Sequence, residues 1–385
     1  MNIEQKVIEW RQHIHQHPEF GTLEHETAAF VANKLEEFGL EVHRGIGGTG
    51  VVGILKCGDS SRSIGLRADM DALHIHEENT FSYASVNEGA MHACGHDGHT
   101  AMLLAAAHEL ALSKNFDGTV YFIFQPDEER GTGAKAMIAD GLFTRWKIDA
   151  VYAMHNLPGI PAGHFVTRPH SLMASESSFE IEVIATGGHA AMPHMGTDPI
   201  VVGAQIVTAI QTIVSRNLSA IDETAVISVT EFATNGTVNV IPTKVTITGD
   251  TRSFTDGALH KIEKALERVV AGQCMSAGVE YTYKFNNSFL STINTPDEAA
   301  YAVQAAQAVA GEDKVNGSCQ PFTISEDFSF MLREAPGCYI LVGNGSGASC
   351  GSVALHKPTY DFNDNILNAG LRYWQTLVEQ RLNKA

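Results

Sequence analysis

The stretch Val120-Tyr-Phe-Ile-Phe-Gln-Pro-Asp-Glu-Glu-Arg-Gly-Thr-Gly133 joins an apolar run to a polar turn. Its first five residues, Val120–Phe124, predict a strand buried on both faces, as in a parallel sheet. Two acids, Glu128 and Glu129, follow directly, and glycines come after them. A strand that ends in acids and then glycines is typical of α/β enzymes, which bring side chains to the sheet edge. The stretch therefore predicts an α/β fold with a site at the end of this strand.

Neighbouring segments predict the same architecture. The apolar runs Val51–Leu55, Ile64–Ala68 and Ala150–Met154 indicate further short buried strands. Helices are expected over Thr27–Phe38, which is amphipathic, and over an Ala-rich segment from about Thr100 to Leu112. The alternation of helices and strands favours a mixed α/β sheet in this part of the chain.

The pattern changes from about residue 178 to a β-α-β-β-α-β order. The segments are Phe179–Ala185, Pro199–Asn217, Ala225–Phe232, Lys244–Arg252, Gly257–Ser276 and Val279–Phe285. Such a split unit forms a ferredoxin-like layer, and its position predicts a small domain inserted into a larger one. We expect the larger domain over residues 1–177 and 290–385, and the inserted domain over residues 178–289.

Length and charge exclude several classes of protein. A chain of 385 residues exceeds the roughly 250 to 300 residues that one hydrophobic core usually serves. The formal net charge of −18, with no cluster of Lys or Arg, argues against binding to nucleic acid or to an anionic membrane surface. No apolar run approaches the roughly 20 residues that span a bilayer.

The cysteines and the N-terminal segment indicate a reducing compartment. The six cysteines are scattered without close pairing: Cys57, Cys94, Cys274, Cys319, Cys338 and Cys350. The first residues predict an amphipathic helix and not a secretory signal peptide, because no basic region precedes an apolar stretch. A disulfide framework is therefore not expected, and a cytoplasmic location fits best.

A cluster of metal-binding residue types lies at Met91–His99, within MHACGHDGH. Either Cys94 or His96 alone would more often be a buried packing residue. Three histidines, one cysteine and one aspartate within eight residues make a poor packing unit and a good ligand loop. We expect His92 and His99 to orient ligands or cap the following helix, because a metal site uses few imidazoles directly.

Acids and a further histidine follow the other predicted strands. One of Glu128 and Glu129 can ligate a metal, and the other can take a proton from water. Asp69 and Asp71 lie on one side of an extended chain and can orient a ligand or the base; a turn or a helix cap is the alternative. His155 ends the next strand, which gives a Glu and a His from consecutive strand ends.

The chain resembles the co-catalytic metal amidohydrolases, which include aminoacylases, carboxypeptidase G and hippurate hydrolase. It is most similar to the branch that cleaves N-acyl and indoleacetyl amino acids, and the resemblance spans essentially the whole chain. The matching motifs are HPE at 17–19, RADMDAL at 67–73, MHACGHDGHT at 91–100, EE at 128–129, HNLPG at 155–159, GGHAAMPH at 187–194, NVIP at 239–242, SEDF at 325–328 and His356.

The resemblance implies a role for each matching residue. It assigns two divalent ions per subunit to five ligands: Cys94, His96, Glu129, His155 and His356. Glu128 is then the general base and Asp71 orients it. In the inserted lid and dimerisation domain, His189 polarises the scissile carbonyl, from the same chain or across a dimer, and Asn239 and Arg252 grip the substrate carboxylate. Taken singly, these three are a loop histidine, a turn asparagine and a strand-end arginine.

The activity implied is metal-dependent hydrolysis of the amide bond of N-acyl amino acids, such as hippurate, N-acetyl or indoleacetyl conjugates. Zinc suits the Cys/His/Glu ligands, and manganese or nickel is an alternative. A homodimer or higher homo-oligomer is expected from the resemblance alone. Two other functions remain open: a dinuclear metal dipeptidase or aminopeptidase, and a non-catalytic ligand-binding relative built on the same fold.

Two residues depart from the usual pattern of this branch. Asp127 stands where a small residue commonly precedes the glutamate pair, and His74 stands where proline commonly closes the RADMDAL turn. An extra acid beside the base can raise the pKa of that base or narrow substrate choice, and an extra histidine can loosen the turn or add a ligand.

Overall fold

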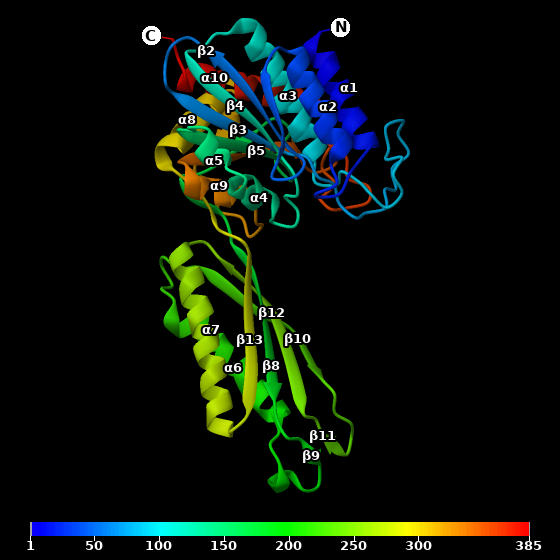
Figure 1. Ribbon diagram of the computed structural model, residues 1–385, viewed down its shortest axis with the longest axis vertical. Coiled ribbons are helices and arrows are strands. Elements are labelled where there is room, and N and C mark those ends of the chain that lie inside the picture. Colours follow the sequence, from blue (N-terminus) through cyan, green and yellow to red (C-terminus); the bar gives the residue numbers. More distant parts are fainter. Residues whose placement is uncertain (1, 385) are drawn as a thin grey trace. The chain divides into compact units, whose positions relative to one another are not determined.

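The computed structural model describes residues 2–384 and divides the chain into two compact units (Figure 1). Unit 1 runs to Leu172 and continues over Ile293–Pro321 and from Glu326 onward. Unit 2 comprises Met173–Thr292 and Phe322–Ser325. Each unit buries its own cluster of apolar side chains, so each has its own hydrophobic core.

Unit 1 is built on an eight-stranded mixed sheet in the order β1-β2-β4-β3-β5-β16-β6-β15. The strands β4, β3, β5 and β16 run parallel, whereas β1 and β2 form an antiparallel edge. The strands span Glu41–Ile46 (β1), Gly50–Cys57 (β2), Ser63–Asp69 (β3), Gly118–Gln125 (β4), Ala150–Pro158 (β5), Phe165–Val166 (β6), Val315–Asn316 (β15) and Gly337–Gly345 (β16). The predicted α/β class with a mixed sheet is confirmed.

The helices of unit 1 cover both faces of this sheet. The crossovers from β3 through α3 to β4, and from β4 through α4 and α5 to β5, step across the sheet in opposite directions. Because such crossovers are right-handed, α3 and α4 lie on opposite faces. The helices span Ile3–Gln16 (α1), His25–Glu37 (α2), His96–Ser113 (α3), Gly133–Ala139 (α4), Leu142–Arg145 (α5), Pro296–Ala310 (α8), Phe328–Glu334 (α9) and Leu367–Arg381 (α10).

The Ala-rich helix α3 lies at the centre of the core of unit 1. It packs against α1, α2, α10 and β3, and its residues from His96 to Ala107 are all buried. Small side chains allow this close approach on every side of the helix. The helix begins at His96, four residues before the predicted start, and its N-cap is Gly95, which has a φ of 98° that favours glycine.

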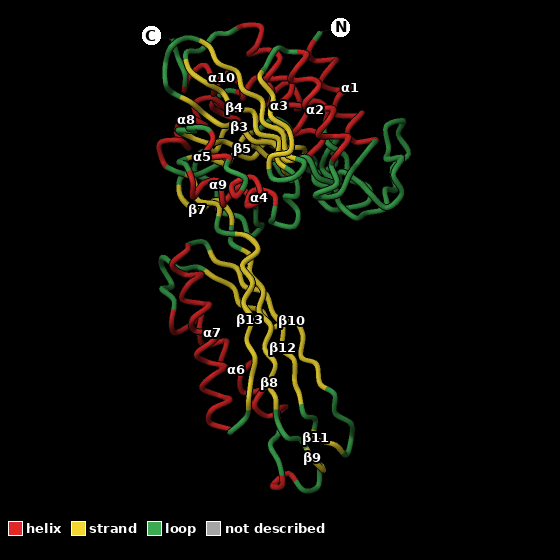
Figure 2. Tube along the Cα trace, viewed as in Figure 1, coloured by secondary structure: helices red, strands yellow, loops and turns green. Residues whose placement is uncertain are grey.

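Unit 2 is a four-stranded antiparallel sheet in the order β10-β12-β8-β13, with α6 and α7 packed together on one face (Figure 2). In chain order the strands are arranged 2-3-1-4, as in a ferredoxin-like layer. Its elements span Glu176–Ile184 (β8), Pro199–Asn217 (α6), Ala225–Thr234 (β10), Lys244–Ser253 (β12), Asp256–Ala277 (α7) and Glu280–Phe289 (β13). The six predicted segments of this unit are therefore confirmed as elements.

Short strands complete the fold. β9 (Gly188–His189) pairs with β11 (Val240–Ile241), next to the end of the sheet where β12 begins, and β7 (His170–Met173) pairs with β14 (Thr292–Asn294). The most important strand that the sequence analysis missed is β16, which is buried along its whole length. The sequence of β16 is Gly337-Cys-Tyr-Ile-Leu-Val-Gly-Asn-Gly345. Its three glycines are unfavourable in a strand interior and so indicate a loop, although β16 is a central strand.

One helix in residues 2–384, α6, is long and apolar enough to cross a membrane by length and composition alone. About 33% of its most apolar window is buried inside the fold, where it packs on the unit 2 sheet. A single helix of this kind is weak evidence for a membrane span.

The central place of α3 predicts a large cost for truncating its side chains. Leu104, which is fully buried, should lose about 2–5 kcal/mol of unfolding free energy when changed to Ala, because the mutation leaves a cavity. Leu112→Ala on the same helix is the control, since Leu112 is 71% exposed and should change stability by less than about 0.5 kcal/mol. Urea unfolding of both variants measures the difference. Equal stabilities would contradict the central position of α3.

Candidate active site

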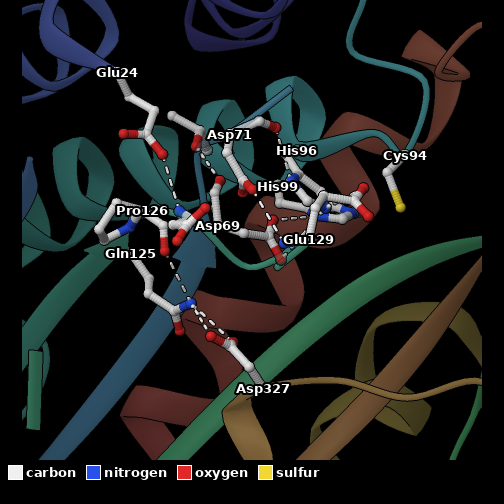
Figure 3. Close-up of polar contacts among 12 residues, drawn as sticks. Glu24, Asp69, Asp71, Cys94, His96, His99, Gln125, Pro126, Glu129 and Asp327 are labelled. Atoms are coloured by element: carbon white, nitrogen blue, oxygen red, sulfur yellow. Dashed lines mark hydrogen bonds and ion pairs between the residues drawn. The ribbon is translucent and has the colours of Figure 1, made fainter. Parts of the chain in front are cut away.

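The carboxyl ends of three neighbouring parallel strands carry the predicted acids and histidine. β3 ends at Asp69, β4 ends three residues before Glu128, and His155 lies near the end of β5. Parallel neighbours bring these ends to one edge of the sheet, beside the point where the crossovers change direction. Figure 3 shows acids and ligand-type side chains gathered at this edge: Asp69, Asp71, Cys94, His96 and Glu129.

The five residues expected to ligate metal form two overlapping groups. One ligand atom from each of Cys94, His96 and His155 lies within 4.8 Å of the others. Cys94, Glu129 and His356 form a second group by the same measure. Cys94 therefore belongs to both groups, and His356 joins the strand-end residues from the far end of the sequence. Sequence reasoning from residue types alone missed His356, because no local cluster surrounds it.

Hydrogen bonds to one nitrogen leave the other nitrogen of each buried imidazole available. Nδ1 of His96 lies 2.9 Å from the carbonyl oxygen of Asp71, and Nδ1 of His155 lies 2.6 Å from that of Asn156. A carbonyl can only accept, so each Nδ1 carries a proton, and Nε2 is the nitrogen that can bind a cation when the imidazole is neutral. Nε2 of His155 lies 3.4 Å from Sγ of Cys94. This is the arrangement that metal-ligating histidines usually show.

Unsatisfied atoms and a shifted pKa indicate that this group of side chains suits a cation. Among residues 2–384, Nε2 of His96 and Oε1 of Glu129 are buried without a hydrogen-bond partner. Burial, followed by Glu129 and Glu128, raises the pKa of the Cys94 thiol well above its ordinary value. A nearby cation would favour the thiolate. One thiolate with imidazoles and a carboxylate is a donor set that suits zinc.

Glu128 has the surroundings of a general base. It is buried, and burial, then Glu326 and Glu129, raise its pKa well above the ordinary value. An oxygen of Glu128 lies within 4.8 Å of ligand atoms of both His96 and Glu129. The two adjacent glutamates therefore both reach the ligand groups, and the raised pKa of Glu128 favours uptake of a proton by its carboxylate.

Asp71 contacts two of the residues expected to ligate metal, His96 and Glu129. Its Oδ1 lies 3.2 Å from Nδ1 of His96, and its Oδ2 accepts a hydrogen bond of 3.1 Å from the backbone N–H of Glu129. These contacts fix the orientation of His96 and the path of the chain at Glu129. The expected role of Asp71 in orienting Glu128 stays a prediction.

The turn before the two glutamates is held by the unusual Asp127. This residue has a φ of 52°, which non-glycine residues seldom adopt. Its N–H donates to Oε1 of Glu24 at 2.9 Å, and its Oδ1 accepts from Nε of Arg130 at 2.6 Å. The extra acid is therefore paired with a cation, and the acids that chiefly raise the pKa of Glu128 are others. The second departure, His74, is exposed and stacks on the ring of Phe20.

A buried arginine that the sequence analysis did not single out supports the edge of the sheet. Arg67 donates to Oδ2 of Asp69 at 2.6 Å, to Oε1 of Glu326 at 2.9 Å and to Oδ1 of Asp327 at 3.0 Å. It also donates to Gln125 at 2.9 Å. The sequence did contain a signal for this network: Arg67 places a charge inside the predicted buried strand Ile64–Ala68, and a buried charge requires partners of opposite charge.

The two remaining histidines of the Met91–His99 stretch, His92 and His99, belong to neither of the two ligand groups described above. Both nitrogens of His99 are occupied, with Nδ1 2.6 Å from Asp69 and Nε2 2.8 Å from Oδ1 of Asn156. His92 is buried, and neither of its nitrogens has a hydrogen-bond partner within residues 2–384. The expectation that these histidines orient ligands or cap the helix stays a prediction.

The three predicted residues of unit 2 do not lie together. Val240 pairs with His189 in the β9–β11 ladder, so His189 and Asn239 are neighbours, and both are exposed. Arg252 lies near the opposite end of β12. The eight steps from Lys244 to Arg252 span on the order of 25 Å of extended chain. Within one copy of unit 2, Arg252 is therefore far from the other two residues.

Arg252 is bound to acids in this structure. Its Nη1 lies 2.7 Å from Oε2 of Glu176, and its Nε donates to Oδ2 of Asp250 at 3.0 Å. It also donates to the hydroxyl of Ser325 at 3.4 Å. The guanidinium expected to grip a carboxylate thus already faces two carboxylates of its own chain.

Comparison with known proteins gives a consistent result along the whole chain. The hippurate hydrolase of Campylobacter jejuni is 39% identical over 368 residues, which cover 96% of this chain and 94% of that protein. The IAA-amino acid hydrolase ILR1-like 4 of Arabidopsis thaliana is 34% identical over 393 residues, covering 97% of this chain and 87% of that protein.

A solved structure shares the fold of the whole chain. The Bacillus subtilis YXEP protein, a dinuclear metal binding peptidase from the M20 family, superposes with a TM-score of 0.86 at 28% identity, over 100% of this chain and 99% of that one. The model of peptidase family M20/M25/M40 matches residues 65–380, a range that begins in β3 and includes every proposed ligand. The chain belongs to peptidase family M20/M25/M40.

Proposed function

We propose that this protein is a metal-dependent amidohydrolase that cleaves N-acyl amino acids to a carboxylic acid and a free amino acid. The observation that carries the proposal is the pair of ligand groups that share Cys94, with the buried Glu128 beside them. Relatives named for hippurate, N-acetylcysteine and IAA-amino acid hydrolysis support the substrate class. The acyl group can thus be aromatic, small or indolic.

The two groups of side chains support two divalent ions per subunit. The residues that would hold them are Cys94, His96, Glu129, His155 and His356. Ions at these ligands would lower the pKa of a bound water and polarise the acyl carbonyl. Zinc is our proposed ion, with manganese and nickel as alternatives, because the soft thiolate and imidazoles favour it.

The residues of the chain then divide the work of amide hydrolysis. Glu128 accepts a proton from the attacking water and later delivers it to the leaving nitrogen. Asp71 holds His96 and the backbone of Glu129 in place through its two carboxylate oxygens. His189 donates to the oxyanion that forms at the carbonyl, and Asn239 and Arg252 bind the carboxylate of the substrate.

We further propose a homodimer in which the two ends of unit 2 serve different active sites. His189, in β9 beside the start of β12, and Arg252, near the end of β12, lie on the order of 25 Å apart in one chain, which exceeds the length of an N-acyl amino acid. Two such residues can contact the same substrate only if they come from different subunits. Free thiols at all six cysteines support a reducing, cytoplasmic location as part of the same proposal.

A substrate panel with a base variant tests the activity. Enzyme stripped of metal and reloaded with zinc or manganese is expected to release amine from hippurate, N-acetyl amino acids or indoleacetyl-aspartate, but not from dipeptides. Glu128→Gln should keep its metal and lose about 100- to 10,000-fold in kcat, because the base is gone. Cleavage of dipeptides alone would instead favour a peptidase. Near-normal activity of the variant would remove Glu128 from the mechanism.

Changing Cys94 to Ser tests the shared ligand. A hydroxyl binds soft and borderline metals much more weakly than a thiolate, and loss of a ligand should cost at least the roughly 10- to 100-fold seen for outer partners. We expect dialysed Cys94→Ser to retain less metal per subunit than wild type, measured by elemental analysis. Cys350→Ser is the control, because Cys350 is exposed and outside the ligand groups. Equal metal content in both variants would show that Cys94 only packs.

Mixing two inactive variants tests the shared active site. His189→Ala lacks the oxyanion donor and Glu128→Gln lacks the base, so each homodimer should be impaired. After the subunits exchange, half of the dimers are mixed, and one of their two sites combines an intact Glu128 with an intact His189. Activity should rise to about a quarter of the wild-type value. Failure to recover activity, with mixed dimers demonstrated by mass spectrometry, would place His189 and Glu128 in the same subunit's site.

A further inference from the structure

The ion pairs of Arg252 bear on how the proposed substrate would be recognised. Arg252 lies near the end of β12, and Glu176 is the first residue of the neighbouring strand β8. Nη1 of Arg252 lies 2.7 Å from Glu176, and Nε lies 3.0 Å from Asp250. One positive charge therefore faces two negative charges. A carboxylate of a ligand that approaches Arg252 meets a net negative group of side chains.

The two acids hold the guanidinium in different ways. Asp250 lies two residues before Arg252 on the same strand and accepts a hydrogen bond from Nε at 3.0 Å. Glu176 belongs to another strand, and the hydroxyl of Ser325 donates to the same oxygen, Oε2, at 2.8 Å. Glu176 therefore has a second partner that can keep its carboxylate hydrogen-bonded after it leaves Arg252.

The exposure of these side chains permits such an exchange. The side chains of Arg252, Glu176 and Asp250 are 24%, 35% and 36% exposed. Ion pairs in contact with water contribute little, because both charges are well solvated when they separate. A ligand carboxylate that makes two parallel hydrogen bonds to the guanidinium forms a stronger contact than a single ion pair.

We infer that Glu176 is a specificity-determining residue that acts through Arg252: it holds the guanidinium in the free enzyme and yields to the carboxylate of the substrate. This inference rests on the proposed function, in which Arg252 binds that carboxylate. A ligand with a carboxylate can displace Glu176, whereas the neutral amide of the same ligand cannot. The charge of Glu176 thus lowers the affinity of Arg252 for carboxylate ligands, whereas a neutral amide, which does not displace Glu176, binds without using Arg252.

Removing this charge gives an effect that a merely structural role would not give. In Glu176→Gln, the KM for hippurate should fall about 2- to 5-fold, the effect of losing one solvated ion pair, with kcat unchanged. The amide of hippurate, assayed as a substrate or as a competitive inhibitor, should bind as it does to wild type. An unchanged or raised KM for hippurate, or an equal fall for hippurate and its amide, overturns the inference.

A matched control lies on the same strand. Glu180 of β8 pairs with Lys284 at 2.7 Å, and within residues 2–384 the ion pairs of Arg252 are with Glu176 and Asp250, so Glu180→Gln should alter neither KM. Arg252→Lys tests whether Arg252 itself binds the carboxylate of the substrate. This variant should raise the KM for hippurate but leave binding of the amide unchanged. If it does not, Arg252 is not the carboxylate ligand and the inference fails. If the wild-type protein cleaves no N-acyl amino acid, the proposed function is wrong, and the inference that rests on it is wrong as well.

Discussion

The buried guanidinium of Arg67 is the interaction on which the active edge of the sheet depends. Three acidic side chains, Asp69, Glu326 and Asp327, surround it, and all of them are buried. Breaking a buried ion pair by removing one partner typically costs about 3–5 kcal/mol, because a charge is left uncompensated. Arg67 thereby joins β3 to Glu326 and Asp327, the two residues directly before α9, which come from the last third of the sequence.

The effect of this cation extends to the ligand groups through a chain of hydrogen bonds. Asp69, held by Arg67, contacts His99, and His99 contacts Asn156, the neighbour of the proposed ligand His155. No residue in this chain needs to touch a substrate. Its consequence is rigidity, because each side chain has its orientation fixed by a partner that is itself fixed. A site that must hold groups within tenths of an ångström requires such support.

The sequence predicted the strand ends well, because buried parallel strands produce apolar runs that stop abruptly in polar residues. Glu128 and His155 could be found in this way. His356 could not, since a lone histidine in a loop carries no periodic signal, and it was identified by resemblance alone. β16 was missed because its glycines resemble a loop, and the Arg67 network was missed because its partners are far apart in the chain. Contacts across long sequence separations leave no local pattern.

The order of the strands has a consequence for how the chain folds. β16 lies between β5 and β6 in the sheet of unit 1. Along the chain, however, the main segment of unit 2, Met173–Thr292, separates β16 from both of these strands. Unit 2 is nearly continuous in sequence, so its sheet can form as soon as its residues leave the ribosome. The sheet of unit 1 must wait with an open edge beside β5 until residues 337–345 arrive. An unpaired, buried-type strand edge is prone to aggregation, and β5 presents such an edge until residues 337–345 pair with it.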